Sequence, residues 1–343
     1  MKEYIEKIMS GEDLTMDEMT KVMEGLMSGT IDPVLAGSFL TALKMKKEAV
    51  AEIIAGARVL RQKAMTIDLA QEITLDTCGT GGDALGTFNI STGVAILSAA
   101  AGVCVVKHGN RSVSSKCGCA DVLEALGVAI ELQPEQVKAC IEKTQMGFLY
   151  APIFHATMRH VGSVRKTLGY RTIFNILGPL ANPASASYQL VGVFDEQLLM
   201  IFAKVLKELG VKQAMVVHGM DGLDEITIAS ETKICELREG EITLKTISPE
   251  DFGYKRAPLS TIVGGDSTTN AQILLDIFQG KKGPMRDVLV LNAGAALYTC
   301  QKAATIKEGI NMAEHILDTG KAMHKLNEFV EVTNMLKRVS IAG

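Results

Sequence analysis

Apolar side chains follow a helical spacing through the first 66 residues of the chain. Within residues 50–60 they recur at intervals of three and four, which is the period of an amphipathic helix. Helix starts are marked by a capping box at residues 15–18 and by Asp32 followed by Pro33 at the first helical position. We therefore predict a small helical domain over residues 1–66, with helices at about 2–9, 15–29, 32–43 and 47–63.

From residue 73 onward the pattern changes, because short apolar or β-branched runs alternate with helical stretches. This alternation predicts a large α/β domain over residues 73–343, with helices on both faces of a central sheet. Residues 234–244 predict an antiparallel hairpin that turns at Arg238, Glu239 and Gly240. We expect strands at 73–77, 103–106, 128–130, 189–193, 214–217, 226–229 and 288–291, and helices at 90–101, from 121, and at 134–143, 196–209, 267–279, 293–298 and 306–322.

Four glycines follow the first of these strands, in the sequence LDTCGTGGDALGTFNIST at residues 75–92. Glycine permits positive φ and lets backbone N–H groups approach a ligand closely. Asn89 or Ser91 can cap the helix that follows, and the N-terminus of that helix adds its dipole to the same place. We interpret the loop as a site for a phosphorylated ligand, in preference to a tight turn that binds nothing.

The same loop loosely matches the dinucleotide-binding fingerprint. That fingerprint needs a helix that begins inside the glycine run and an acidic residue at the end of the next strand. Here the helix begins later, near Asn89, and the next strand ends in the basic pair Lys107 and His108. These two differences argue against an NAD site.

A second loop, KHGNRSVSSKCGCAD at residues 107–121, also has the composition of an anion site. Because it follows a buried strand, we place it beside the glycine loop, where α/β sheets bind their ligands. Two such loops indicate a ligand with phosphate groups at two ends. Cys117 and Cys119 are too close and too isolated for a zinc site, so we interpret them as packing residues. The charges come from Lys107, Arg111 and Lys116, and the hydroxyl donors from Ser112, Ser114 and Ser115.

An acidic pair, Asp224 and Glu225, ends the sequence HGMDGLDE after a further strand. Adjacent carboxylates on a loop suit Mg²⁺, which takes oxygen ligands and commonly bridges to phosphates. A turn with two surface acids is the alternative. The two phosphate loops favour the metal.

Composition and charge narrow the class of protein. The net charge of −4 argues against a nucleic-acid or membrane-surface partner. Residues 1–13 are too charged for a signal peptide, and the longest apolar run, residues 94–106, is too short to span a bilayer. Seven cysteines without a framework spacing are typical of a reducing compartment, so we expect a cytoplasmic protein.

Taken together, GTGGD and NIST, KHGNR, HGMDGLDE and VRKTLGYRTIFNILGPLANP (residues 164–183) resemble the anthranilate phosphoribosyltransferases over nearly the whole chain. The resemblance implies transfer of phosphoribose from 5-phosphoribosyl 1-pyrophosphate to the amine of anthranilate in tryptophan biosynthesis. It also implies Mg²⁺ as cofactor, a homodimer, and the nucleoside phosphorylase-like fold of class IV phosphoribosyltransferases. In that fold a later segment, about residues 166–180, joins the helical domain.

The resemblance also implies site residues. For phosphoribosyl pyrophosphate they are Gly79, Gly82, Asp83, Thr87, Asn89, Ser91, Thr92, Lys107, Ser115 and Cys119; for anthranilate, Gly79, His108, Asn110, His155 and Arg165; for magnesium, Ser91, Asp224 and Glu225. No catalytic base is implied.

This chain departs from the family pattern at two places. The family usually has serine where Cys117 and Cys119 stand, and a thiol is a weaker hydrogen-bond donor than a hydroxyl. It often has proline where Ser163 stands. Two alternative functions stay open from the sequence: a pyrimidine-nucleoside phosphorylase of the same fold, which would have no use for the acidic pair, and a nonenzymatic relative that binds nucleic acid.

Overall fold

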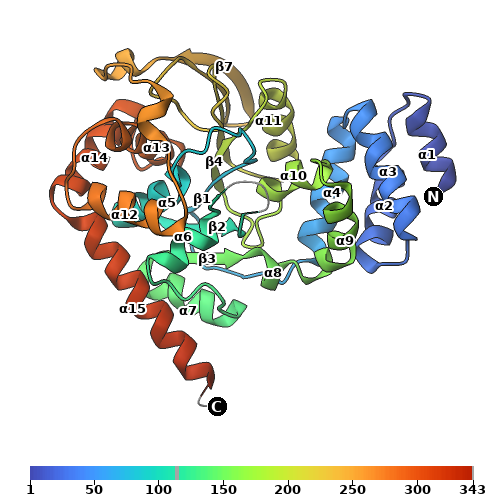
Figure 1. Ribbon diagram of the computed structural model, residues 1–343, viewed down its shortest axis with the longest axis horizontal. Coiled ribbons are helices and arrows are strands. Elements are labelled where there is room, and N and C mark those ends of the chain that lie inside the picture. The colour runs from blue at the N-terminus through green and yellow to red at the C-terminus, as the bar shows by residue number, and fades with distance from the viewer. Residues whose placement is uncertain (113–115, 342–343) are drawn as a thin grey trace.

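The computed structural model describes residues 1–112 and 116–341 (Figure 1). The first four helices pack together at the end of the molecule farthest from the C-terminal helices. The predicted capping box is present, since the Thr15 side chain accepts from the Glu18 amide and the Glu18 side chain from the Thr15 amide. These helices are α1 (Lys2–Met9), α2 (Met16–Ser28), α3 (Pro33–Lys46) and α4 (Val50–Lys63).

Two helices from the middle of the chain join this group. α9 (Arg159–Leu168) packs on α2 and α3, and α10 (Ile173–Leu177) packs on α3 and α4. Val161, Val164 and Ile173 are buried in the same apolar core as Phe39 and Leu60. The helical part is therefore assembled from two separate stretches of sequence.

A seven-stranded mixed sheet, in the order β3-β2-β1-β4-β5-β6-β7, forms the centre of the second part. The first five strands in this order are parallel, so their carboxyl ends meet at one edge. The last two form the predicted hairpin, which pairs antiparallel with β5. The strands are β1 (Thr74–Gly79), β2 (Cys104–Gly109), β3 (Met146–Tyr150), β4 (Tyr188–Gly192), β5 (Gln213–Gly219), β6 (Thr232–Arg238) and β7 (Glu241–Ile247).

Alternate residues of the buried strands belong to different cores. Leu190 packs with α5, α13, α14 and α15 on one face, whereas Val191 packs with α11 and the helical part on the other. This alternation is the two-residue period of a strand. The helices of this part are α5 (Ile90–Ala100), α6 (Cys119–Ala125), α7 (Pro134–Thr144), α8 (Ala151–Phe154), α11 (Leu198–Glu208), α12 (Ser267–Phe278), α13 (Pro284–Thr299), α14 (Ile306–Asp318) and α15 (Lys321–Ile341).

Three predicted strands are wrong. Residues 128–130 follow α6 without strand pairing, and the Ala129 amide donates to the Thr333 hydroxyl of α15 at 3.2 Å. Residues 226–229 are also irregular, because both backbone groups of Ile226 are bonded to the Asn292 side chain. Residues 288–291 lie inside α13, which is buried on nearly all sides and so lacks the polar face that would mark a helix in the sequence.

Two further elements differ from the prediction. The strand β3 is absent from the sequence-based assignment, although its residues pair in register with β2. The helix expected over residues 306–322 is interrupted at Gly320, whose φ of 71° ends α14 and lets α15 leave in a new direction.

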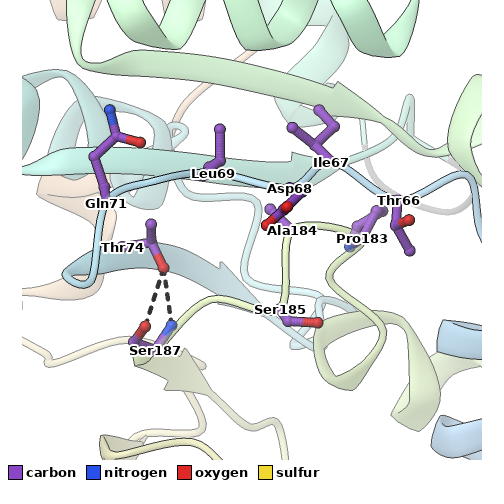
Figure 2. Close-up of a pocket in the computed structure, with 10 residues that line it drawn as sticks. All are labelled: Thr66, Ile67, Asp68, Leu69, Gln71, Thr74, Pro183, Ala184, Ser185 and Ser187. Atoms are coloured by element: carbon purple, nitrogen blue, oxygen red, sulfur yellow. Dashed lines mark hydrogen bonds between the residues drawn. The ribbon is translucent and has the colours of Figure 1, made fainter.

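A cavity of about 350 Å³ lies between residues 66–74 and residues 183–187, whose side chains are drawn in Figure 2. Thr74, which lines it, accepts from the Ser187 amide at 3.0 Å. The cavity lies where β1 and β4 begin. Ligands of α/β sheets bind at the opposite, carboxyl edge.

Candidate active site

Glycines end four of the five parallel strands at the carboxyl edge of the sheet. Gly79 of β1 and Gly192 of β4 are register partners, so they lie side by side at this edge. The glycine loop begins at Gly79, and Gly81, Gly82 and Gly86 have φ between 65° and 75° as expected. The loop therefore stands above the centre of the sheet.

Asp224 fits into the space that the two strand-ending glycines leave. A Cβ on Gly192 would lie 1.4 Å from the Asp224 carbonyl oxygen, and one on Gly79 would lie 2.6 Å from Asp224 Oδ2. The same Oδ2 accepts the Gly81 amide at 2.7 Å. The structure thus brings the acidic pair against the glycine loop, although 143 positions separate Gly81 from Asp224.

Burial raises the pKa of Asp224 to about 7, and the charge of Asp83 adds to this effect. Burial, followed by the charge of Asp224, raises the pKa of Glu225 well above its usual range, while Lys107 and the Ser91 amide oppose the rise. Acids that repel one another in this way favour a bound cation. Asp83 itself accepts the Leu85 amide at 3.2 Å.

The donor set here fits Mg²⁺. Ser91, Asp224 and Glu225 supply only oxygen atoms, which this ion prefers. Within residues 1–112 and 116–341, no group of three or more histidine, cysteine or carboxylate side chains forms a complete protein cage. Mg²⁺ is commonly held by one or two carboxylates plus the phosphates of a substrate.

Lys107 lies beneath the glycine loop. Its side chain is buried, and Nζ donates to the Thr77 carbonyl at 2.6 Å and to Ser91 Oγ at 3.3 Å. The ammonium group therefore lies between the end of β1 and the first turn of α5. From the sequence we assign this lysine to the phosphoribosyl pyrophosphate site, and its place beside the glycine loop agrees with that prediction.

Two residues that the sequence analysis missed separate the ends of β1 and β2 beside the glycine loop. The register of β1 with β2 pairs Thr74 and Leu75 of β1 with residues of β2. At the next residue, Asp76 Oδ1 accepts a hydrogen bond from the His108 amide of β2 at 3.2 Å, where a backbone bond between the strands would otherwise form. Asn182 Nδ2 then donates to Asp76 Oδ2 and to the Val106 carbonyl, both at 2.8 Å. The two side chains form a wedge between β1 and β2. A carboxylate inside an apolar strand run was the available signal.

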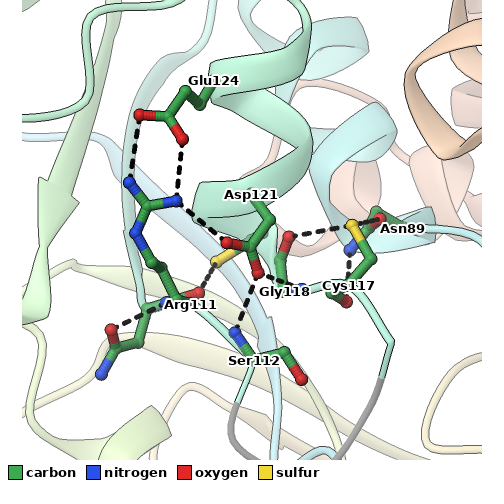
Figure 3. A network of polar contacts seen from close by, with 9 residues as sticks. Asn89, Arg111, Ser112, Cys117, Gly118, Asp121 and Glu124 are labelled. Carbon is green, nitrogen blue, oxygen red and sulfur yellow. Dashed lines mark hydrogen bonds and ion pairs between the residues drawn. The ribbon is translucent and has the colours of Figure 1, made fainter. Parts of the chain in front are cut away.

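The second loop is tied down by α6 (Figure 3). The Asp121 carboxylate accepts the Ser112 amide at 3.0 Å and the Gly118 amide at 2.8 Å. Arg111 forms ion pairs with Asp121 and Glu124 at 3.0 Å and 2.8 Å. From the sequence we expect Arg111 to supply charge for an anion, and in the structure its guanidinium is paired with these two carboxylates. Ser114 and Ser115 lie outside the described residues.

Asn89 stands at the N-cap position of α5, but its side chain forms no capping hydrogen bond with the described residues. Its Oδ1 accepts from Asn270 at 2.9 Å and from the Cys117 thiol at 3.3 Å, so the amide joins α5 to α12 and to the second loop. Cys119 Sγ lies 3.4 Å from the Asn110 carbonyl and occupies the space beside Gly109. Thr92 is buried, and within residues 1–112 and 116–341 its hydroxyl has no hydrogen-bond partner. Thr87 forms a β-bridge with Val263.

A cleft of about 460 Å³ opens next to these groups and is lined from both parts of the molecule. The ring centroids of His108 and His155 are 5.0 Å apart, and both Nε2 atoms are buried without a hydrogen-bond partner among the residues that the structure describes. Burial lowers the pKa of His108 to about 3 and that of His155 to about 4. Arg165 Cζ lies 5.3 Å from the centre of the Phe174 ring. The predicted residues Gly79, His108, Asn110, His155 and Arg165 all line this cleft.

Comparisons with known proteins agree along the whole chain. The helical bundle domain of the glycosyl transferase family matches residues 2–64, and the a/b domain of that family matches residues 71–323. Anthranilate phosphoribosyltransferase from Alkaliphilus metalliredigens is 50% identical over 98% of this chain and 99% of that protein.

Solved structures give the same result. The anthranilate phosphoribosyltransferase of Thermus thermophilus superposes with a TM-score of 0.91 at 42% identity, covering 96% of this chain and 99% of that one. The enzyme from Saccharomyces cerevisiae, solved in complex with PRPP (phosphoribosyl pyrophosphate) and Mg, superposes with a TM-score of 0.90 at 28% identity over 97% of each chain. In the described part of this chain, no helix is both long and apolar enough to cross a membrane.

Proposed function

This chain belongs to the anthranilate phosphoribosyltransferase family, and we propose that it transfers phosphoribose from phosphoribosyl pyrophosphate to the amine of anthranilate, releasing pyrophosphate in tryptophan biosynthesis. One observation is the main support for placing this reaction at the site described above. The glycine loop, the buried Lys107 and the acidic pair meet at one edge of the sheet, directly beside a cleft lined by Arg165.

The phosphoribosyl end of the substrate occupies the loops. Backbone N–H groups of the glycine loop and the first turn of α5 bind phosphate oxygens, as helix N-termini commonly do. Lys107 adds a positive charge from below, and the unpartnered Thr92 hydroxyl gains a partner. Gly82, Asp83, Thr87 and Asn89 of the glycine loop also belong to this phosphoribosyl pyrophosphate site. Cys119 and, by sequence, Ser115 belong to it from the second loop.

Ser91, Asp224 and Glu225 would hold Mg²⁺, which when bound offsets the negative charge of pyrophosphate. Because Asp224 lies against the start of the glycine loop, we place this contribution at the pyrophosphate and not at the aromatic ring.

Anthranilate occupies the cleft. The Arg165 guanidinium binds its carboxylate in a fixed fork. His108 and His155 face it as neutral rings, because burial keeps their pKa values low. The amine of anthranilate is an uncharged aryl amine, so it attacks C1 of the ribose without a strong base, and catalysis consists mainly of positioning and charge stabilisation.

Three further features belong to the proposal. We place the domain limits at residues 1–66 and 73–343, with residues 166–180 joining the helical domain, so that closure about the connecting segments excludes water from the cleft. The assembly is a homodimer, and the compartment is the cytoplasm, which suits seven cysteines that show no framework spacing.

The proposal is tested by mixing the protein with anthranilate, phosphoribosyl pyrophosphate and Mg²⁺ and following anthranilate fluorescence. The fluorescence should fall only when all three are present. Incubation with thymidine and phosphate should yield no thymine, and thymine formation would favour the nucleoside phosphorylase alternative. A gel shift at low salt should likewise find no nucleic-acid binding.

A further inference from the structure

Arg171 lies against the glycine loop although it comes from the helical side of the cleft, two residues before α10. A Cβ on Gly82 would lie 1.9 Å from Arg171 Nη2 and 2.4 Å from Cζ. The guanidinium therefore rests directly on the backbone of the loop, at the residue that precedes Asp83. The φ of 75° favours glycine at position 82, and the absence of a Cβ lets the guanidinium approach this closely.

The side chain is held on a fixed support. Arg171 Cζ lies 4.1 Å from the ring centroid of Phe194, which follows β4. The Phe194 amide donates to Thr80 Oγ1 at 3.1 Å, and the Thr80 amide donates to the Gly192 carbonyl at 2.9 Å. The aromatic ring beneath the guanidinium and the first residues of the glycine loop are thus joined by hydrogen bonds.

The backbone of Arg171 is held by the helical part. Lys44 of α3 donates to the Arg171 carbonyl at 2.9 Å, and the Lys44 ammonium lies 4.9 Å from the ring centroid of Tyr170. Arg171 consequently extends from a helix-bound backbone across to the loop of the α/β part.

The charge of Arg171 is available for a ligand. Among the described residues, no carboxylate forms an ion pair with its guanidinium, whereas Arg111 is paired with Asp121 and Glu124. Three acids, Asp83, Asp224 and Glu225, stand at the same loop. A polyphosphate that binds there needs cations in addition to Lys107 and a metal ion.

We propose that Arg171 binds the pyrophosphate group of phosphoribosyl pyrophosphate from the helical side of the cleft. This inference rests on the function proposed above. The planar guanidinium offers paired N–H donors that match two phosphate oxygens, and stacking on Phe194 fixes its plane. Binding then ties the two parts of the molecule to the leaving group.

The test measures the binding of inorganic pyrophosphate by calorimetry at saturating Mg²⁺, together with both Michaelis constants. Arg171→Gln should weaken the affinity for pyrophosphate roughly ten- to a hundredfold, because the substitution removes charge-assisted hydrogen bonds. It should raise the KM for phosphoribosyl pyrophosphate and leave that for anthranilate within about twofold. Arg171→Lys keeps the charge without the fork, so it should fall between Arg171→Gln and the parent. Lys166→Gln, which removes an exposed charge from α9, is the matched control and should bind pyrophosphate like the parent.

Unchanged pyrophosphate affinity in a folded Arg171→Gln protein would overturn the inference, as would a rise in the anthranilate KM alone. If Arg171→Gln does not fold, an Arg171→Lys protein with parental affinity would overturn it equally. A parent that binds pyrophosphate through Arg171 but never consumes anthranilate would instead refute the proposed function and leave this site standing.

Discussion

An alanine at position 192 should displace Asp224 while leaving most of the sheet intact. Its Cβ would lie 1.4 Å from the Asp224 carbonyl oxygen and 2.4 Å from the carbonyl carbon, where ordinary contacts begin near 3.4 Å. Both atoms belong to the backbone, so no side-chain rotation relieves the overlap. The main chain at Asp224 must therefore move by about 2 Å.

Such a shift is as large as a magnesium–oxygen bond, which measures roughly 2.0–2.1 Å and tolerates little distortion. We expect Gly192→Ala to raise the Mg²⁺ concentration for half-maximal turnover roughly ten- to a hundredfold, as losses around a metal commonly do. Overpacking should lower the free energy of unfolding by only about 1–3 kcal/mol.

The assay is the rate of anthranilate fluorescence loss as a function of Mg²⁺ at saturating phosphoribosyl pyrophosphate. Gly162→Ala is the matched control, since nothing lies within 4 Å of the Cβ it adds to α9. Gly79→Ala should have a smaller effect than Gly192→Ala, because its Cβ meets the Asp224 carboxylate, which can rotate. A folded Gly192→Ala protein whose Mg²⁺ titration overlays that of the parent would refute the reasoning.

Asp224→Asn combined with Glu225→Gln should raise the Mg²⁺ requirement and slow saturated turnover without loss of helical circular dichroism; a titration identical to the parent's would contradict the assignment. Arg165→Ala should raise the KM for anthranilate more than that for phosphoribosyl pyrophosphate, because the guanidinium fork binds a carboxylate, and equal rises would count against this. Burial lowers the pKa of His108 and His155 to about 3 and 4, so the unfolded chain binds more protons below pH 6.5. The free energy of unfolding should therefore fall between pH 6.5 and 4, by up to about 1.4 kcal/mol per pH unit for each histidine. In urea titrations His155→Gln should show a shallower fall, and an unchanged slope would disprove neutral burial of that ring.

The parts of the site that could be predicted from sequence are those whose chemistry is local. A few consecutive residues are enough to identify each of three features: the glycine loop, Lys107 near the end of its strand, and the adjacent Asp224 and Glu225. The N-terminal helices could also be predicted from the sequence, because their caps and their 3.6-residue period are local signals.

The parts that could not be predicted depend on distant partners. Asp76 and Asn182 are 106 positions apart, and only the fold shows that they separate β1 from β2. Asn292 accepts and donates hydrogen bonds at Ile226, 66 positions away, which removes the backbone groups that a strand would use. Residues 288–291 are apolar on every side, so periodicity alone cannot distinguish a buried helix from a buried strand.

Product stoichiometry tests the central claim most directly. With anthranilate, phosphoribosyl pyrophosphate and Mg²⁺ present, pyrophosphate released and anthranilate consumed should be measured in the same reaction, and the product identified by mass spectrometry. We predict one pyrophosphate for each anthranilate and a product with the mass of N-(5-phosphoribosyl)anthranilate. Release of pyrophosphate without consumption of anthranilate would contradict the account, since it would mean that water and not the aryl amine receives the ribose.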